Sequence, residues 1–294
     1  LQILTDDPET PELNVSISLE VLPPGISVSP MELDFEIHLA ESPEETQTVT
    51  ITNTGFDTLD VELSTDITVT DIDGNVYETV QIGDQLWMKE NLKVTHYNNG
   101  DEIQYVQSES SEPNVWANLS TGAYGYYNDD LSHQEIYGNL YNWYAVETGN
   151  LAPEGWHVPT DDEIKELEMY LGMSQEEADS WGWRGTDEGG KLKEVGTAHW
   201  VSPNTGATNE SGLTALPGGS RFYNDGIYQN MGGLGYFWSS SEDDSNYAWT
   251  RLLSYNFSGI HRGNYNKRSG FSVRCVKDEP EVGTILVPYS SGWN

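Results

Sequence analysis

The most constraining part of this sequence is the stretch from Gly155 to Leu171, in which an apolar segment ends at a proline and a helix follows at once. Trp156 and Val158 are spaced like two residues on one face of a strand. Thr160 and Glu163 then have the spacing of a capping box, in which each side chain binds a backbone N–H group at the start of a helix. The stretch therefore predicts a strand, a sharp turn and a helix with a defined start.

The residues after this turn predict an amphipathic helix that packs against a core. Ile164, Leu167 and Leu171 follow one another at intervals of three and four residues and form one apolar stripe. Ser174 and Glu177 repeat the capping-box spacing and predict that a second short helix begins there.

Two further local predictions concern the residues before this stretch. Residues 69–80 have the pattern of a β-hairpin, with Asp73 and Gly74 suited to a tight primed turn. Residues 139–146 are a candidate for a short helix just ahead of the turn.

The first 66 residues predict a small β-rich unit. Residues 14–66 alternate apolar and polar side chains in four or five short segments, which is typical of part of a β-sandwich. The motifs SPMELDF (29–35) and VTITNTG (49–55) resemble those of Ig-like surface modules. Because such a sandwich needs about seven strands, we expect an incomplete Ig-like module with an unpaired edge. Residues 1–13 are acidic and contain two prolines, and we expect an extended N-terminal leader there.

The segment at 67–278 carries a series of motifs that identifies a family. In order they are IGDQLWMKENL (82–92), YGNLYNWYAV (137–146), GWHVPT (155–160), NTGATNESG (204–212), LPGG (216–219), FWSSS (237–241) and GFSVRCV (270–276). This set resembles the Fibrobacter succinogenes major paralogous domain, which is in turn similar to the C-type-lectin-like fold of formylglycine-generating enzymes and of retroelement-diversified binding proteins. The resemblance implies an α+β, mostly β domain with two or three short helices, here preceded by the incomplete Ig-like β-sandwich.

The reactive side chains do not form a recognisable catalytic set. The enzymes of similar fold use a pair of cysteines, whereas this chain has only Cys275. Family members commonly carry a cysteine where Ala152 stands, paired with the cysteine of the closing strand, so the resemblance implies that this disulfide is missing and that Cys275 is a buried apolar residue. We expect a structural role for His157 in its strand-to-helix turn, and His199 has no partner at metal-ligand spacing. We predict that the protein is not an enzyme and uses no cofactor.

The charge of the chain argues against several partners. Its 48 Asp and Glu outnumber its 13 Lys and Arg and give a formal net charge of −35. Such a chain is unsuited to nucleic acid and to an anionic membrane surface, and it has no apolar run of ~18 residues that could cross a bilayer. Glu242, Asp243 and Asp244 could hold calcium through their oxygens, although a solvated acidic loop is the better explanation of these residues. Because the sequence opens at Leu1 rather than Met, we expect an extracellular protein whose leader has been removed.

The stretch at 236–268 has the composition of a recognition surface. Rigid aromatic side chains are interleaved there with Asn, Ser, Gly and Arg, which is typical of surfaces that bind proteins and could equally stack on sugars. The expected ligand-binding residues are Trp238, Tyr247, Trp249, Arg251, Tyr255, Asn256, His261, Arg262, Asn264 and Tyr265. The alternative is that many of these aromatic residues belong to the core of a fold with few strands.

The end of the chain suggests self-association. The C-terminal tail at 279–294 contains a strand without an obvious partner in its vicinity, formed by Thr284, Ile285, Leu286 and Val287. Donating this strand to the open edge of a neighbour's Ig-like module would build a head-to-tail homopolymer, and therefore an adhesive filament at the cell surface. Six basic residues at 251–277, against none before Lys89, would add attraction between copies. The alternative is that the strand completes its own module, which leaves a non-polymeric surface binding module.

Overall fold

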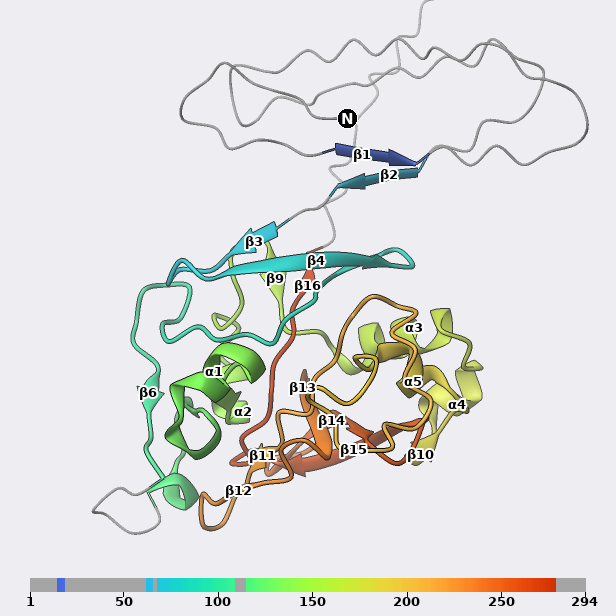
Figure 1. Ribbon diagram of the computed structural model, residues 1–294. Helices are drawn as coiled ribbons and strands as arrows, with labels where there is room; N and C mark the ends of the chain where they lie inside the picture. Colours follow the sequence, from blue (N-terminus) through green and yellow to red (C-terminus); the bar gives the residue numbers. More distant parts are fainter. Residues whose placement is uncertain (1–14, 19–61, 66–67, 109–114, 279–294) are drawn as a thin grey trace, which may run out of the picture. The chain divides into compact units, whose positions relative to one another are not determined.

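The computed structural model describes residues 15–18, 62–65, 68–108 and 115–278, and the chain divides into two units, Leu1–Asp66 and Ile67–Asn294. In the first unit, strand β1 (Val15–Ser18) pairs with strand β2 (Glu62–Thr65) in antiparallel fashion (Figure 1). The other predictions for residues 1–66, and the strand predicted at 284–287, lie outside the described residues.

The second unit contains a five-stranded antiparallel sheet, and the last described strand is one of its interior strands. Its order is β3 (Thr68–Thr70), β4 (Val76–Ile82), β5 (Gln85–Met88), β16 (Val276–Lys277) and β9 (Trp156–His157). Val276 of β16 pairs with Trp87 of β5 on one side and with His157 of β9 on the other. The motifs at 155–160 and 270–276 are therefore neighbours in space although they are far apart in the sequence.

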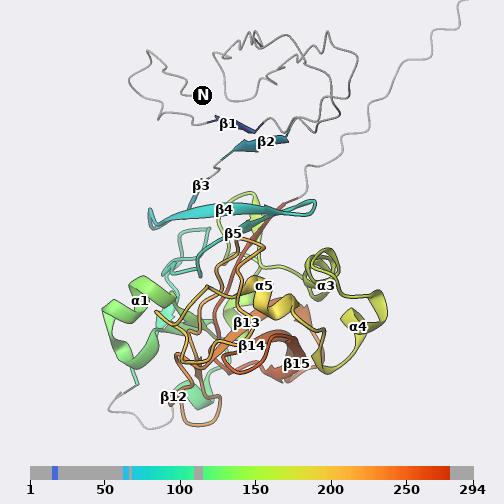
Figure 2. The same ribbon diagram turned by 45° about the vertical axis from the view of Figure 1, so that its right-hand side comes forward.

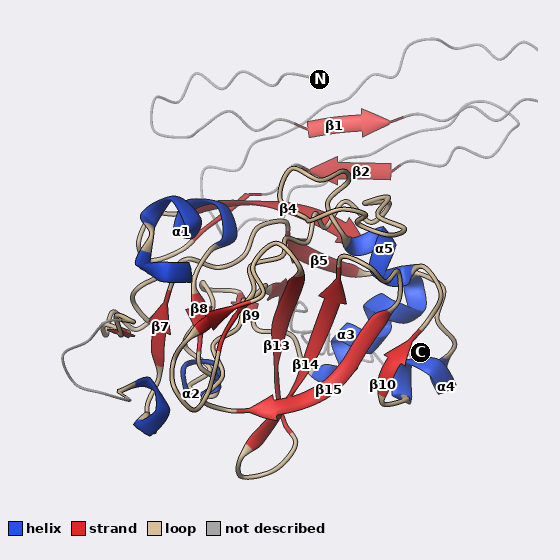
Figure 3. Cartoon of the chain, turned by 60° about the horizontal axis from the view of Figure 1, so that its bottom comes forward, coloured by secondary structure: helices blue, strands red, loops and turns tan. Residues whose placement is uncertain are grey.

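A four-stranded antiparallel sheet contains the longest strands of this unit (Figure 3). Its order is β10 (Gly182–Arg184), β15 (Ile260–Asn266), β14 (Tyr247–Ser254) and β13 (Leu234–Glu242). Two smaller sheets consist of β6 (Gln104–Tyr105), β7 (Ala123–Gly125) and β8 (Leu140–Tyr141), and of β11 (Ser220–Arg221) and β12 (Tyr228–Gln229).

The described residues contain five α-helices, whereas the sequence predicts two or three. They are α1 (Leu131–Tyr137), α2 (Trp143–Val146), α3 (Asp161–Tyr170), α4 (Gln175–Asp179) and α5 (Glu188–Leu192). Except for α3, each has seven residues or fewer, which is too short for a periodic pattern to reveal. The helix predicted at 139–146 begins only at Trp143, because residues 140–141 pair with β7. Figure 2 shows α3 and α4 side by side.

Both predicted capping boxes are confirmed. The Thr160 hydroxyl accepts a hydrogen bond from the Glu163 N–H group at 3.2 Å, and the Glu163 carboxylate accepts one from the Thr160 N–H group at 2.7 Å. Ser174 and Glu177 make the same reciprocal pair at the start of α4. The predicted apolar stripe is buried and consists of Ile164, Leu167 and Leu171.

The hairpin predicted at 69–80 is confirmed, but its turn is not the predicted primed type. A primed turn with Asp73 as its first central residue requires a positive φ at Asp73. Asp73 is not one of the non-glycine residues with a positive φ. Gly74 alone has that conformation in the loop, with a φ of 82°. The Asp71 carboxylate organises the loop instead, because it accepts hydrogen bonds from the N–H groups of Asp73 and Asn75 and from the Tyr77 hydroxyl.

Two large groups of buried apolar side chains hold the second unit together, and a smaller third group includes Trp116 and Leu119. The first surrounds Tyr141 and Phe271 and includes both Ala152 and Cys275. The second contains side chains of α3, α5 and the four-stranded sheet. Cys275 is fully buried, as predicted. The second unit is thus a sheet-rich α+β domain.

Candidate functional site

The first turn of α3 places a carboxylate against the four-stranded sheet. Asp161 directly follows the helix cap Thr160, and Glu168 lies seven residues later on the same face of the helix. Both carboxylates are buried, with side-chain exposures of 8% for Asp161 and 0% for Glu168. Because isolated buried charges are very costly, these two groups need partners from the sheet.

Three arginines of the sheet supply those partners. Arg251 on β14 reaches both carboxylates, with its Nη1 2.7 Å from Asp161 and its Nε 2.6 Å from Glu168. Arg184 on β10 binds Glu168 at 2.5 Å, and Arg262 on β15 binds Asp161 at 2.6 Å. Burial opposes ionisation of Asp161, but the hydrogen bonds from Arg262 and Arg251 outweigh it and hold the pKa of this carboxyl well below its ordinary value. We call these five residues the buried ion network.

The buried ion network positions an aromatic side chain at the surface. The Arg262 guanidinium lies 3.7 Å from the centre of the Trp249 ring, within the range of a cation–π contact. Trp181 packs edge-on against the same ring at 5.2 Å and 68°. Tyr247 lies two residues before Trp249 on β14 and so projects from the same face of the sheet.

We call Trp181, Trp249 and Tyr247 the aromatic platform. Trp181 is 56% exposed and Tyr247 is 40% exposed, so both rings are accessible to a ligand. Since Arg262 is held by the Asp161 carboxylate and by the Asp179 carbonyl at 3.1 Å, the ring above it has a fixed support.

A second group of exposed aromatic residues lies on the other face of the same sheet edge. Trp183 packs against Phe257 at 4.9 Å and against His261 at 5.3 Å. Trp181 and Trp183 would lie on one face in a regular strand, but the φ of 85° at Gly182 reverses the alternation and sends them to opposite faces. The ligand-binding residues predicted from the sequence include neither tryptophan, because a strand of three residues is too short for a periodic pattern to reveal.

Three of the ten residues predicted to bind a ligand are buried rather than exposed. Trp238 is 1% exposed, packs on Phe271 at 4.6 Å and donates its indole N–H to the Tyr141 carbonyl. Arg251 and Arg262 are buried in the ion network described above. Their guanidinium groups are paired with buried carboxylates, so they do not face a ligand.

The remaining predicted residues do not form one surface. Tyr265 packs on Tyr236 and Phe271, and Tyr255 packs against the second core group. Tyr247 and Asn256 are exposed, and the half-buried residues are Trp249, Tyr255, His261, Asn264 and Tyr265. Of these, Asn264 lies opposite Trp249 across β14 and β15 and extends the aromatic platform, whereas His261 belongs to the Trp183 group on the other face.

The calcium site considered at 242–244 does not form. Glu242 pairs with Lys267, Asp243 accepts a hydrogen bond from the Asn264 amide, and Asp244 accepts bonds from two N–H groups of the turn. Across the described part of the chain, no group of three or more His, Cys, Asp or Glu side chains could hold a metal ion.

Most of the basic residues that would add attraction between copies lie inside the domain. Of the 13 Lys and Arg residues, seven are buried: Arg184, Lys193, Arg221, Arg251, Arg262, Lys267 and Arg274. Four of the six basic residues at 251–277 are among them. Lys193 shows how such a cation is held, since its Nζ donates to the carbonyls of Thr205, Ser254 and Phe257 at 2.8 to 3.0 Å. Burial lowers the pKa of this ammonium to about 8.

The two candidate histidines are both paired with carboxylates. His157 lies 2.8 Å from Glu163 through Nε2 and 2.6 Å from Asp278 through Nδ1, so it links the start of α3 to the end of β16. The hydrogen bond to Glu163 is the largest effect that raises the pKa of His157 to about 9. His199 lies 2.7 Å from Glu194. Burial raises the pKa of the Cys275 thiol well above its usual value.

These features define a class of protein: a sheet-rich α+β domain with seven of its 13 basic side chains buried and with exposed aromatic rings at one sheet edge. The family described as Fibrobacter succinogenes major domain matches residues 80–277, more than half of the chain, and the chain belongs to that family. No curated protein and no solved structure gives a match. Within the described ranges, no helix is long and apolar enough to cross a membrane.

Proposed function

We propose that this chain is a non-enzymatic extracellular recognition protein of C-type-lectin-like fold, and that its aromatic platform binds a neutral glycan. The observation that carries the proposal is the exposed Trp181 packed on Trp249, whose other contact is the buried Arg262. Flat rings stack on apolar faces of ligands, and a ring that is already fixed loses little conformational entropy on binding.

The charge around the aromatic platform favours an uncharged ligand. Asp162 is 88% exposed and Asp179 is 51% exposed, and both share Lys165 with the buried Asp161. A surface of this sign repels carboxylated or sulfated polymers, whereas its carboxylates accept hydrogen bonds from sugar hydroxyls. A stable protein partner needs about 800 Å² of contact on each side, and a platform of three aromatic residues suits a smaller ligand better.

Affinity electrophoresis through gels that contain a neutral polysaccharide, with an acidic polysaccharide in parallel, tests this proposal. Trp181→Ala and Trp249→Ala should each weaken binding about tenfold or more, equivalent to ~1.4 kcal/mol. Tyr223→Ala is the matched control, because Tyr223 is also exposed, at 37%, but lies between β11 and β12. If wild type and both tryptophan variants were retarded equally by every neutral polysaccharide, the proposal would be wrong. If the same tryptophans instead bound a protein, the ligand would be a protein and the glycan proposal would be wrong.

Self-assembly into an extracellular filament by strand exchange is our second candidate function. The sequence pattern at 14–66 predicts four or five strands, fewer than the about seven of an Ig-like sandwich, and in the described part of the first unit β1 pairs with β2. A donated strand such as that predicted at 284–287 would extend this sheet. Because four of the six basic residues at 251–277 are buried, the candidate rests mainly on strand exchange rather than on electrostatic attraction.

Native mass spectrometry and electron microscopy of the full chain test the filament. The expected result is a ladder of multiples of 32.8 kDa that truncation after Asp278 abolishes, while glycan binding by the truncated chain persists. A 32.8 kDa species that resists assembly under all ionic conditions would exclude the filament and leave the recognition module.

A further inference from the structure

Strand β10 is an edge of the four-stranded sheet, and its outer side has no partner strand among the described residues (Figure 3). It pairs with β15 on one side only, with Trp183 opposite His261. In an antiparallel pair, alternate residues direct their N–H and C=O groups away from the neighbouring strand. Apart from the ladder with β15, no backbone–backbone hydrogen bond to residues 181–185 occurs within the described part of the chain. The outer backbone groups of β10 are therefore available to one more strand.

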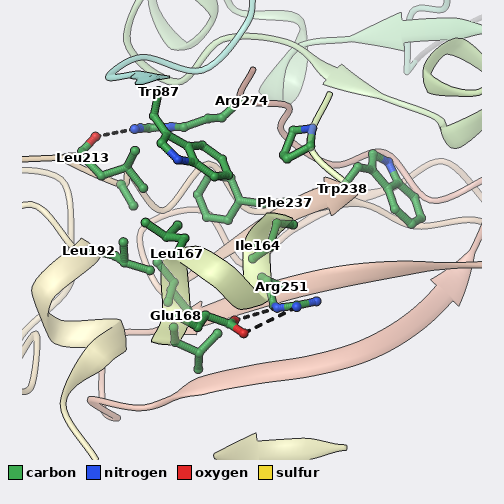
Figure 4. Close-up of a pocket in the computed structure, with 14 residues that line it drawn as sticks. Trp87, Ile164, Leu167, Glu168, Leu192, Leu213, Phe237, Trp238, Arg251 and Arg274 are labelled. Carbon is green, nitrogen blue, oxygen red and sulfur yellow. Dashed lines mark hydrogen bonds and ion pairs between the residues drawn. The ribbon is translucent and has the colours of Figure 1, made fainter. Parts of the chain in front are cut away.

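The side chains beside this edge form an exposed apolar surface on one face of the sheet. Arg184 binds Glu168 of α3 beside Arg251 (Figure 4), so the preceding residue, Trp183, lies on the face that is turned away from α3. Trp183 is 45% exposed, and Phe257, which is 40% exposed, packs against it at 4.9 Å. Edge strands usually carry charged residues or proline that oppose the addition of another strand, whereas the exposed side chain of β10 is a tryptophan.

The charge around the edge favours a basic partner. Residues 174–187 contain one basic side chain, Arg184, and it is buried. Lys165 and Lys191 each pair with one exposed carboxylate of this segment. The exposed carboxylates are those of Glu176, Glu177, Asp179 and Asp187. The tail at 279–294 has two Glu and no Lys or Arg, and a second copy of the chain has a formal net charge of −35, so like charge disfavours both as partners.

We infer that β10 is a docking site for an extended, positively charged segment of a partner protein, which adds to the sheet as a further strand. The outer backbone groups of β10 supply hydrogen bonds, and every second side chain of the segment lies on the face of Trp183 and Phe257. The carboxylates at 174–187 attract its Lys and Arg residues. The inference goes beyond glycan binding and does not depend on it, because neither Trp183 nor Phe257 belongs to the aromatic platform.

An array of acetylated and amidated heptapeptides is the probe, used with the full chain. Each peptide has Lys at both ends and Val, Ile, Phe or Tyr at alternate inner positions. Trp183→Ala and Phe257→Ala should each weaken the tightest peptide about tenfold or more. Leu131→Ala removes a side chain that is 67% exposed on α1 and should leave the affinity unchanged. If no peptide of the array bound wild type, or if both variants bound it as wild type does, the inference would be overturned.

Methylation of the peptide backbone separates strand addition from simple contact with the rings. In an added strand every second N–H group faces β10, so N-methylation should weaken binding about tenfold or more at one set of alternate positions and little at the other. Equal effects at both sets would overturn strand addition. This series uses wild type, so it decides even if a variant does not fold.

Two further measurements test the occupant. Glu in place of Lys at both ends of the tightest peptide should weaken binding about tenfold or more. A Glu-ended peptide that binds equally well, or a peptide of residues 282–288 that binds more tightly, would overturn the assignment to a basic partner. Self-association of wild type that Trp183→Ala abolishes would instead identify a second copy as the occupant and overturn the inference.

Discussion

At the scale of single residues, His157 is a link between two carboxylates, and its protonation is coupled to folding. Its pKa is raised from 6.5 in the unfolded chain to about 9 in the folded domain, chiefly by Glu163. The protonated form is therefore favoured by folding, and its contribution is complete below pH ~6.5 and disappears as pH rises through about 9. Glu163 behaves in the opposite sense: its pKa is lowered to about 2, so its contribution is present above pH ~4.5 and is lost as pH falls towards 2.

We predict that His157→Gln removes the part of the pH dependence that lies between pH 6.5 and 9. Urea unfolding of wild type should show a free energy of unfolding that declines over this range, and the variant should show a flatter profile with lower stability at pH 6. The pH dependence that remains in the variant measures the contribution of the other titrating groups. Parallel profiles for the two proteins would mean that His157 is not coupled to folding.

The buried ion network gives a second prediction at this scale. Glu168→Gln leaves Arg184 and Arg251 without their shared anion inside the domain, and we expect a loss of about 3–5 kcal/mol in the free energy of unfolding. Glu166→Gln makes the same chemical change on the exposed face of α3 and should cost less than about 1 kcal/mol. Guanidinium or urea denaturation measures both. Similar costs for the two variants would contradict the role of the buried ion network.

How well the sequence predicts a residue depends on how far away its partners are. Thr160, Glu163 and Cys275 are explained by neighbours or by their apolar surroundings, and their positions were predicted. The partners of Arg251 and Arg262 lie 83 to 101 residues away on α3, so nothing near them in the sequence indicates burial. Aromatic and basic residues in one segment therefore resembled a ligand surface although several of them are in the core.

At the scale of elements, the start of α3 sets the position of the buried ion network. Thr160 is the cap, Asp161 is the next residue, and Glu168 follows two turns later, so a shift of the helix start would move both carboxylates. The short strand β10 is defined differently, since the positive φ of Gly182 places one tryptophan on each face of the sheet. Caps leave a local pattern in the sequence, whereas a three-residue edge strand does not, which explains why the first was predicted and the second was missed.

We predict that Thr160→Ala lowers the free energy of unfolding by about 1 kcal/mol, because the N–H group of Glu163 loses its acceptor. Thr160→Ser retains the hydroxyl and should restore most of that stability, whereas Thr160→Val should not. The measurement is chemical denaturation, with hydrogen exchange of the first-turn amides of α3 as the local readout. Equal stability of the Ala and Ser variants would show that the cap does not hold the helix start.

At the scale of the whole molecule, more than half of the basic side chains are buried, whereas most carboxylates in the described residues are exposed. Seven of the 13 basic residues are buried, while the whole chain carries a formal net charge of −35. Several of the other cations already have carboxylate partners, such as Lys89 with Glu78 and Lys93 with Glu135. Repulsion between the remaining carboxylates opposes the compact state, whereas the buried pairs are shielded from solvent ions.

We therefore predict that salt stabilises this protein. Raising the ionic strength from ~0.01 M to ~0.15 M shortens the Debye length from ~30 Å to ~8 Å and weakens the repulsion, so Tm should rise by several degrees. Thermal unfolding in sodium chloride, in choline chloride and in calcium chloride of matched ionic strength separates screening from specific binding. Equal rises in the three salts are expected, because the described residues contain no group of side chains suited to a metal ion. A Tm that falls with salt would show that surface ion pairs dominate over repulsion, and a rise confined to calcium would instead reveal a specific cation site.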